Sequence, residues 1–129
     1  MKPVTKQDWI DALRSGEFKQ GTGVLAKRDP ETGTISYCCL GVLATIAGVD
    51  ARAAPREVDM LFTFDDNTKA YGIIPQAYRN TIVSDLNLST LVGLTSRPGF
   101  DVELEGILAT KNDSGATFED IATYLEELA

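Results

Sequence analysis

The chain of 129 residues is predicted to fold as a single α+β domain, residues 1–129, in which one or two β-hairpins pack against about four to five helices. Three observations predict this class. Helix-start signals precede apolar residues at helical spacing, a turn-forming segment separates two extended runs, and the C-terminus has the pattern of a helical hairpin. A chain of this length closes one hydrophobic core, which favours one domain.

The first helix is predicted to begin after Thr5. Thr5 followed three residues later by Asp8 has the form of a capping box, with Asp in place of the usual Glu. Gly16 ends this helix. The apolar residues between these signals share one helical face and are expected in the core: Trp9, Ile10 and Leu13.

A β-hairpin is predicted over residues 23–37, with its turn at Asp29-Pro30-Glu31-Thr32-Gly33. Asp29 can accept hydrogen bonds from the following amides, Pro30 presets φ, and Gly33 supplies the positive φ that closes a bulged turn. The segment 29–34 is similar to the turn of a designed mini-hairpin. That similarity supports the turn geometry and says nothing about function.

A buried central helix is predicted after the hairpin, because residues 39–46 are apolar nearly all round and Gly48 follows as a stop signal. Gly41 in the middle of this helix costs up to about 1 kcal/mol relative to Ala. We therefore expect Gly41 to allow the close approach of another backbone segment.

The middle of the chain gives weaker patterns. Residues 51–57 are predicted as a polar connection, and residues 60–74 as a second, shorter hairpin. Pro75 suits the first position of a further helix, whose shared face is formed by Tyr78, Ile82, Val83 and Leu86. The stretch 89–100 is predicted as a loop that carries three apolar residues inward: Leu91, Val92 and Leu94.

The C-terminus is predicted to form a helical hairpin with its turn at residues 112–115. The first helix places four apolar residues on one face: Phe100, Leu104, Ile107 and Leu108. Thr117 caps the second helix, whose first turn carries Glu119 and Asp120 at the positive end of the helix dipole. Its apolar face contains five residues: Phe118, Ile121, Ala122, Leu125 and Leu128.

The chain contains no histidine, which removes the commonest general base, the histidine-dependent nucleophile pairs and most zinc sites. It also lacks a phosphate-binding loop motif. The carboxylates at 65–66 are expected in a turn, and those of Asp101, Glu103 and Glu105 on a solvated helix face, because neither set has metal-ligand spacing. The sequence therefore predicts a protein with no cofactor, no metal and no enzymatic activity.

Two adjacent cysteines, Cys38 and Cys39, are predicted to be reduced and buried in the core. A disulfide between neighbouring residues requires a strained small ring, which favours two free thiols. Cys38 also falls at the predicted start of the central helix, where a helix N-terminus lowers the pKa of a thiol. A nucleophilic Cys38 is therefore the alternative, and it would make the protein a small cysteine-dependent enzyme.

A formal net charge of −7 opposes generic nucleic-acid binding, because such binding depends on clustered Lys and Arg. The longest apolar run, residues 38–49, is shorter than the ~20 residues that a membrane-spanning helix needs. No apolar stretch follows the charges near the N-terminus, as it would in a secretory signal. We therefore expect a cytoplasmic protein with no membrane partner.

Basic and aromatic side chains form the set most typical of a ligand-binding site. Arg and Lys bind phosphate through charge-assisted hydrogen bonds, while aromatic rings stack on nucleobases. The expected ligand is accordingly a small anionic nucleotide. The predicted ligand-binding residues are Trp9, Lys19, Lys27, Arg28, Tyr37, Arg56, Tyr78 and Arg79.

Several segments spread over the chain resemble one group of proteins. They are residues 9–16, 19–21, 37–43, 112–118 and 121–122, of which Cys-Cys-Leu-Gly-Val-Leu is the most specific part. These segments resemble small, functionally uncharacterised proteins of tailed phages and prophages, whereas the middle of the chain matches poorly. The resemblance implies a phage accessory role and supplies no catalytic residues. Small phage proteins of this kind often bind and neutralise a host factor.

The leading expectation is a non-enzymatic phage accessory protein that counters host defence by binding, with sequestration of a nucleotide immune signal as its first form. It would act in the cytoplasm of an infected bacterial host. The alternative is a protein-binding inhibitor of a host defence enzyme, in which an exposed apolar patch or the acidic final helix contacts the target. The sequence leaves self-association into a homo-oligomer open.

Overall fold

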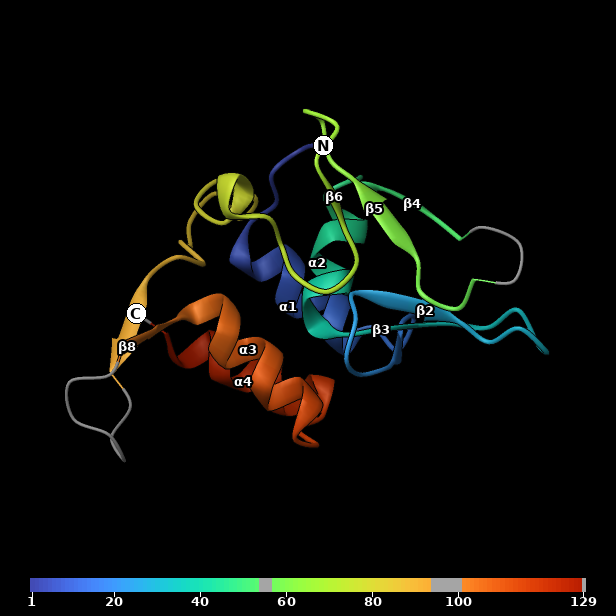
Figure 1. The fold of residues 1–129 in the computed structure, drawn as a ribbon. Helices are drawn as coiled ribbons and strands as arrows, with labels where there is room; N and C mark the ends of the chain where they lie inside the picture. Colours follow the sequence, from blue (N-terminus) through green and yellow to red (C-terminus); the bar gives the residue numbers. More distant parts are fainter. Residues whose placement is uncertain (54–56, 94–100, 129) are drawn as a thin grey trace.

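The computed structural model describes residues 1–53, 57–93 and 101–128, and shows an α+β fold (Figure 1). Within those ranges it contains four α-helices: α1 (Lys6–Arg14), α2 (Cys39–Ile46), α3 (Leu104–Asp113) and α4 (Phe118–Glu127). A short 3-10 helix, η1, covers Gln76–Tyr78. The strands are β1 (Lys19–Gln20), β2 (Ala26–Arg28), β3 (Ile35–Tyr37), β4 (Asp50–Arg52), β5 (Leu61–Thr63), β6 (Lys69–Ala70), β7 (Leu91–Gly93) and β8 (Asp101–Glu103).

Helix α1 confirms the predicted capping box. The Thr5 hydroxyl accepts a hydrogen bond from the Asp8 amide, and the Asp8 carboxylate accepts one from the Thr5 amide, both at 3.1 Å. These bonds satisfy two amides that a helix start leaves without partners. The predicted apolar face is buried: Trp9, Ile10 and Leu13.

The first sheet has the order β1-β3-β2, in which β1 runs parallel to β3 and β2 antiparallel to it. The predicted hairpin forms its antiparallel half. The Asp29 amide donates to the Thr34 carbonyl and the Gly33 amide to the Asp29 carbonyl, each at 2.8 Å. Gly33 has φ +74°, as the predicted turn requires.

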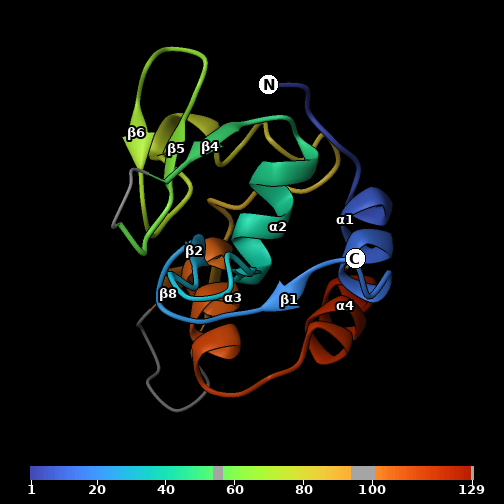
Figure 2. The same cartoon turned by 90° about the vertical axis from the view of Figure 1, so that its right-hand side faces the viewer.

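Helix α2 is the centre of the core, as predicted from its apolar sequence. Figure 2 shows it between the α1–α4 pair and the sheet β4-β5-β6. A Cβ built on Gly41 would overlap the backbone carbonyl of Leu25, just before β2. The expected close approach to Gly41 is therefore confirmed, and it seats the hairpin directly on α2.

The C-terminal helical pair is also confirmed. Thr117 caps α4 through a second reciprocal capping box with Asp120. Helix α4 packs on α1, and Arg14 of α1 joins the two through salt bridges to Glu119 at 3.0 Å and Glu126 at 2.6 Å. The predicted core residue Phe100 lies outside the described residues.

The second hairpin is present as β5 and β6, shorter than predicted. The structure adds β4, which pairs antiparallel with β5, where the sequence predicted only a polar connection. Residues 50–52 are too polar and too few to give a strand pattern by themselves. They are extended because the edge of β5 supplies their hydrogen-bond partners.

The helix predicted after Pro75 is wrong beyond the single turn of η1. The chain there bonds to the N-terminal segment: the Val4 amide donates to the Ile82 carbonyl at 3.0 Å, and the Ser84 amide to the Val4 carbonyl at 2.8 Å. Backbone groups that a helix would need are therefore used elsewhere. Ile82 and Val83 are nevertheless buried, as predicted.

Two further predictions fail near the start of α3. Leu91 was expected to point inward, but it lies in β7 and is 63% exposed. Glu105 was expected on a solvated face and is instead buried in α3. Leu94 lies outside the described residues. No helix among the described residues is long and apolar enough to span a membrane.

Candidate functional site

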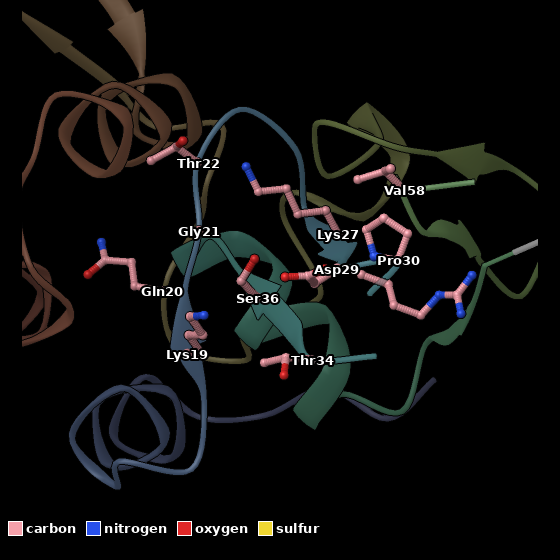
Figure 3. Close-up of a pocket in the computed structure, with 11 residues that line it drawn as sticks. Lys19, Gln20, Gly21, Thr22, Lys27, Asp29, Pro30, Thr34, Ser36 and Val58 are labelled. Atoms are coloured by element: carbon pink, nitrogen blue, oxygen red, sulfur yellow. The ribbon is translucent and has the colours of Figure 1, made fainter. Parts of the chain in front are cut away.

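A groove of about 510 Å³ lies against the first sheet, between β1 and the β2–β3 hairpin (Figure 3). Its volume falls in the ~300–1,000 Å³ range of small-molecule sites. Residues from all three strands and from the segment after β4 contribute to it. They include Lys19, Lys27, Arg28, Asp29, Ser36 and Val58.

Three of these side chains form a row across the sheet. Ser36 of β3 pairs in register with Lys19 of β1 on one side and with Lys27 of β2 on the other. Directly opposite residues on neighbouring strands point to the same face of a sheet. The register thus places one hydroxyl between two ammonium groups. We call Lys19, Ser36 and Lys27 the cationic row.

The cations of the groove form no salt bridge within the described part of the chain. Across the described residues, no carboxylate lies within 4.0 Å of the charged nitrogens of Lys19, Lys27 or Arg28. The other described arginines all form salt bridges: Arg14, Arg52 and Arg79. The groove therefore gathers three cations that form no salt bridge, although Asp29 also lines it.

Arg28 carries a second sign of an incomplete site. Its Nε is a buried side-chain nitrogen without a hydrogen-bond partner in the described part of the chain. A buried donor left unpaired costs about 1–3 kcal/mol. Arg28 follows Lys27 directly on β2 and pairs with Ile35, so its side chain leaves the opposite face of the strand from Lys27 and Ser36.

Gly21 keeps the floor of the groove open. A Cβ on this residue would lie 2.7 Å from the Ser36 Oγ. Glycine leaves the Ser36 hydroxyl in its present position, because a real Cβ atom does not approach an oxygen so closely. The sequence therefore requires Gly21 where β1 leaves the sheet.

The end of α3 and the start of α4 hold the β1 side of the groove. Asn112 is buried, with 1% of its surface exposed. Its Oδ1 accepts hydrogen bonds from Gln20 Nε2 at 2.9 Å and from the Cys39 amide at 3.2 Å. Its Nδ2 donates a hydrogen bond to the Gly21 carbonyl at 2.8 Å. Gln20 Oε1 also accepts from the Phe118 amide at 3.1 Å. We call this set the Asn112 clasp. It fixes a two-residue strand that has few bonds of its own.

One acidic side chain lines the groove, and a second is paired with one of its lysines. Asp29 lines it at the hairpin turn, and its Oδ1 accepts from the Glu31 amide at 2.9 Å. This hydrogen bond lowers the pKa of Asp29. Asp59 faces Lys27 across an isolated antiparallel bridge. The positive charge is therefore local, as expected in a chain of net charge −7.

The sequence of the whole chain, residues 1–129, matches a family described as a domain of unknown function, DUF8296. The chain belongs to the DUF8296 family. No curated protein and no solved structure matches it. The groove and the Asn112 clasp are thus structural features of a DUF8296 domain.

Five of the predicted ligand-binding residues do not contribute to the groove: four lie away from it, and one lies outside the described residues. Trp9 is fully buried and donates from Nε1 to the Cys39 carbonyl at 3.0 Å. The Tyr37 ring packs edge-on against the Phe18 ring, with 5.1 Å between the ring centroids. The Tyr78 ring stacks on the Phe64 ring, with 4.8 Å between the centroids. Arg56 lies outside the described residues.

Arg79 is the fifth, and it is engaged by the protein. Its Nε donates to the Ile74 carbonyl at 2.8 Å, and it forms salt bridges with Glu103 at 2.5 Å and Glu105 at 3.7 Å. Glu105 in turn accepts from the Ile74 amide at 3.0 Å. This buried cluster fastens the segment before η1 to the start of α3. Of the eight predicted residues, the structure brings together Lys19, Lys27 and Arg28.

Cys38 and Cys39 are both free and buried, as predicted. Cys38 caps α2, with its Sγ accepting from the Gly41 amide at 3.4 Å. Burial raises the pKa of Cys38 to about 11 and raises that of Cys39 well above its ordinary value. These shifts oppose thiolate formation, on which a nucleophilic cysteine depends. No cluster of potential metal ligands occurs among the described residues either.

Sequence reasoning missed three residues of the site: Gly21, Ser36 and Asn112. Ser36 gives no signal, because only the register of two strand pairings places it between lysines. Gly21 stands beside the basic Lys19 and ends a polar segment. Asn112 opens the predicted helical turn, where Asn is ordinarily explained by turn propensity alone.

Proposed function

We propose that this DUF8296 protein is a non-enzymatic binding protein whose groove holds a small phosphate-bearing ligand, with a nucleotide as the preferred class. One observation carries the proposal: the cationic row, in which Lys19 and Lys27 flank Ser36 on one sheet face and form no salt bridge among the described residues. Ammonium and hydroxyl groups donate charge-assisted hydrogen bonds to phosphate oxygens.

The contrast between local and overall charge favours a small ligand over a polymer. The chain carries a net charge of −7, which repels a long phosphate backbone at a distance. A ligand with one or two phosphates contacts only the groove, where the positive row is close. Salt screens the long-range repulsion within about 8–10 Å, so the repulsion acts less on a small ligand in the groove than on a long polymer.

The biological role that we propose is sequestration of a nucleotide immune signal in an infected bacterial cell. The resemblance to small proteins of tailed phages and prophages supports this setting. A binding protein needs no catalytic group. The buried thiols and the absence of histidine accord with that role.

A thermal-shift panel tests the proposal. Purified protein is mixed with cyclic oligonucleotides and ADP-ribose derivatives, and Tm is recorded against ligand concentration. A ligand present at 1,000 times its Kd stabilises the folded state by about 4.1 kcal/mol. We expect at least one ligand to raise Tm by several degrees. A flat panel at millimolar ligand would refute the proposed function.

Charge-matched variants show whether the binding occurs in the groove. The double variant Lys19→Ala/Lys27→Ala should lose the ligand-induced rise in Tm. Lys2→Ala/Lys69→Ala removes two exposed lysines that do not line the groove, and should keep it. Equal loss in both pairs would mean that overall charge, not the groove, attracts the ligand.

A protein-binding inhibitor is the second candidate, and one observation favours it. Tyr71 and Ile73 are half exposed, at 52% and 50%, although both are large and apolar. Exposed apolar side chains of this kind are common in docking surfaces. Capture of one stoichiometric host protein that Tyr71→Ser/Ile73→Ser no longer captures, together with a flat nucleotide panel, would favour this candidate.

A further inference from the structure

The groove holds an acid at a defined place relative to the cationic row. Asp29 follows Lys27 by two residues, just past the end of β2, and its amide donates to the carbonyl of Thr34, just before β3, so the strand pairing continues to this point. Residues two apart on a strand share a face, about 7 Å apart. In Figure 3 the Asp29 side chain is directed toward the same space as Ser36. The groove therefore has a cationic part and, one step toward the turn, an anionic part.

Asp29 is an acceptor under ordinary conditions. Its hydrogen bond with the Glu31 amide favours the ionised carboxylate and lowers the pKa. The Glu31 amide donates to Oδ1 at 2.9 Å, and the two oxygens of a carboxylate together can accept about four hydrogen bonds. An ionised carboxylate only accepts hydrogen bonds, so Asp29 offers an acceptor to any hydroxyl that reaches it.

We propose that the groove selects a ribose-bearing ligand, with its phosphate on the cationic row and its free 2′,3′-diol against Asp29. The proposal rests on the proposed function, because it names the ligand class of the same site. Carboxylates bind ribose hydroxyls in this manner in dinucleotide-binding proteins. In a nucleotide, one sugar unit separates the 5′-phosphate from the diol. In the groove, two residues along the chain separate Lys27, which would bind the phosphate, from Asp29, which would bind the diol.

The same carboxylate disfavours a continued phosphodiester. In an oligonucleotide or a cyclic dinucleotide, the 3′ or 2′ oxygen carries a second phosphate instead of a hydrogen. That substitution removes a donor and turns negative charge toward Asp29, which repels it. The groove should therefore prefer ADP-ribose or AMP, which end in a free diol, to cyclic and linear oligonucleotides.

Isothermal titration calorimetry with matched probes tests this selectivity. The probes are AMP, its 2′,3′-dideoxy analogue, ADP-ribose, cyclic di-AMP and inorganic pyrophosphate. Against wild type we expect AMP to bind about tenfold more tightly than dideoxy-AMP, the loss of roughly one charge-assisted hydrogen bond. Cyclic di-AMP should bind more weakly than ADP-ribose.

Asp29→Asn removes the charge and keeps an oxygen that accepts from the Glu31 amide, so the turn is retained. This variant should bind AMP and dideoxy-AMP within about twofold of each other and bind pyrophosphate more tightly than wild type does. Glu31→Gln is the matched control: it removes a neighbouring exposed carboxylate that does not line the groove, and should keep wild-type selectivity.

The outcomes separate the two proposals. Binding of AMP and dideoxy-AMP with equal affinity by wild type would overturn the ribose selectivity and leave the phosphate-binding function standing. Equal changes in Asp29→Asn and Glu31→Gln would overturn it as well, because then only net charge matters. Absence of binding for every probe would overturn the proposed function and this inference together.

Discussion

The backbone carbonyl of Leu25 occupies the space where any side chain on Gly41 would begin. The contact joins the segment before β2 to the middle of α2, and the Leu25 carbonyl also accepts from the Cys38 amide at 3.0 Å. One carbonyl thus fixes both the start of the central helix and the seat of the hairpin. The position of the groove depends on this contact, since two of its three strands belong to the hairpin.

Gly41→Ala should therefore lower the free energy of unfolding by about 3 kcal/mol or more, at the upper end of overpacking effects, because backbone atoms must move apart. Urea denaturation measures the change. Gly106→Ala in α3 is the matched control, since its Cβ would meet nothing within 4 Å. That variant should be neutral or stabilise by about 0.4–1 kcal/mol. Similar losses in both variants would contradict the close contact.

Gly21→Ala should cost about 1–3 kcal/mol for the same kind of reason, but here the obstacle is a side chain. The Ser36 hydroxyl lies 2.7 Å from the new Cβ. In a Ser36→Ala background the same substitution should cost less. A double-mutant cycle on unfolding free energy should give a coupling of about 0.5–3 kcal/mol, and additive values would argue against the contact.

Asn112→Ala should destabilise the protein by about 1–3 kcal/mol, because the Cys39 amide and the Gly21 carbonyl lose a buried partner. Hydrogen exchange should increase most at amides of residues 20–23, which the Asn112 clasp holds. Asn80→Ala is the control, an exposed Asn outside the clasp. Exchange that rises evenly over the whole chain would show that Asn112 stabilises the fold without positioning β1.

The two thiols should react slowly with iodoacetamide at pH 8 in the native protein and rapidly in urea. Burial and the raised pKa of Cys38, about 11, both keep the thiolate scarce. Replacing both cysteines with Ala should cost about 1–3 kcal/mol through lost packing and leave ligand binding intact. Fast native labelling of Cys38 with loss of activity would instead support a cysteine-dependent enzyme.

Glu105 and Glu126 should affect stability with opposite pH dependence. Burial raises the pKa of Glu105, so its contribution is full at low pH and falls as pH rises through the shifted value. The Arg14 salt bridge lowers the pKa of Glu126, so its contribution is present at neutral pH and falls on acidification.

Glu105→Gln should therefore gain stability relative to wild type as the pH rises from acidic to neutral, whereas Glu126→Gln should lose stability relative to wild type over the same change. Thermal unfolding at several pH values measures both. The same slope for the two variants would contradict the assignment of Glu105 as a desolvated carboxylate.

Local signals predicted the parts of the fold that local chemistry determines. The sequence predicts two helix starts, one from Thr5 with Asp8 and one from Thr117. Both can be predicted because the capping hydrogen bonds join residues only three apart in the chain. The turn from Asp29 to Gly33 follows from the same kind of short-range bonding. These elements appear in the structure with bounds close to those predicted.

Long-range pairing explains what the sequence did not predict. Strand β1 has two residues and pairs directly with β3, although β2 comes between them in the sequence, so no periodicity predicts it. The segment around Ile82 has helical spacing, yet its backbone bonds to Val4. The site shows the same limit: Lys19 and Lys27 were predicted as ligand-binding residues, whereas Ser36 between them depends on register alone.

The packing of α1 on α4 has a consequence for the order of events during synthesis. Helix α1 leaves the ribosome early, but the helix that covers it and pairs with Arg14 is made long afterwards. Until then the apolar side chains of α1 lack their main helical partner, and contacts so distant in sequence form slowly. The domain should therefore complete its core only after α4 has emerged, and nascent chains that stall before Phe118 should be targets for chaperones and proteases.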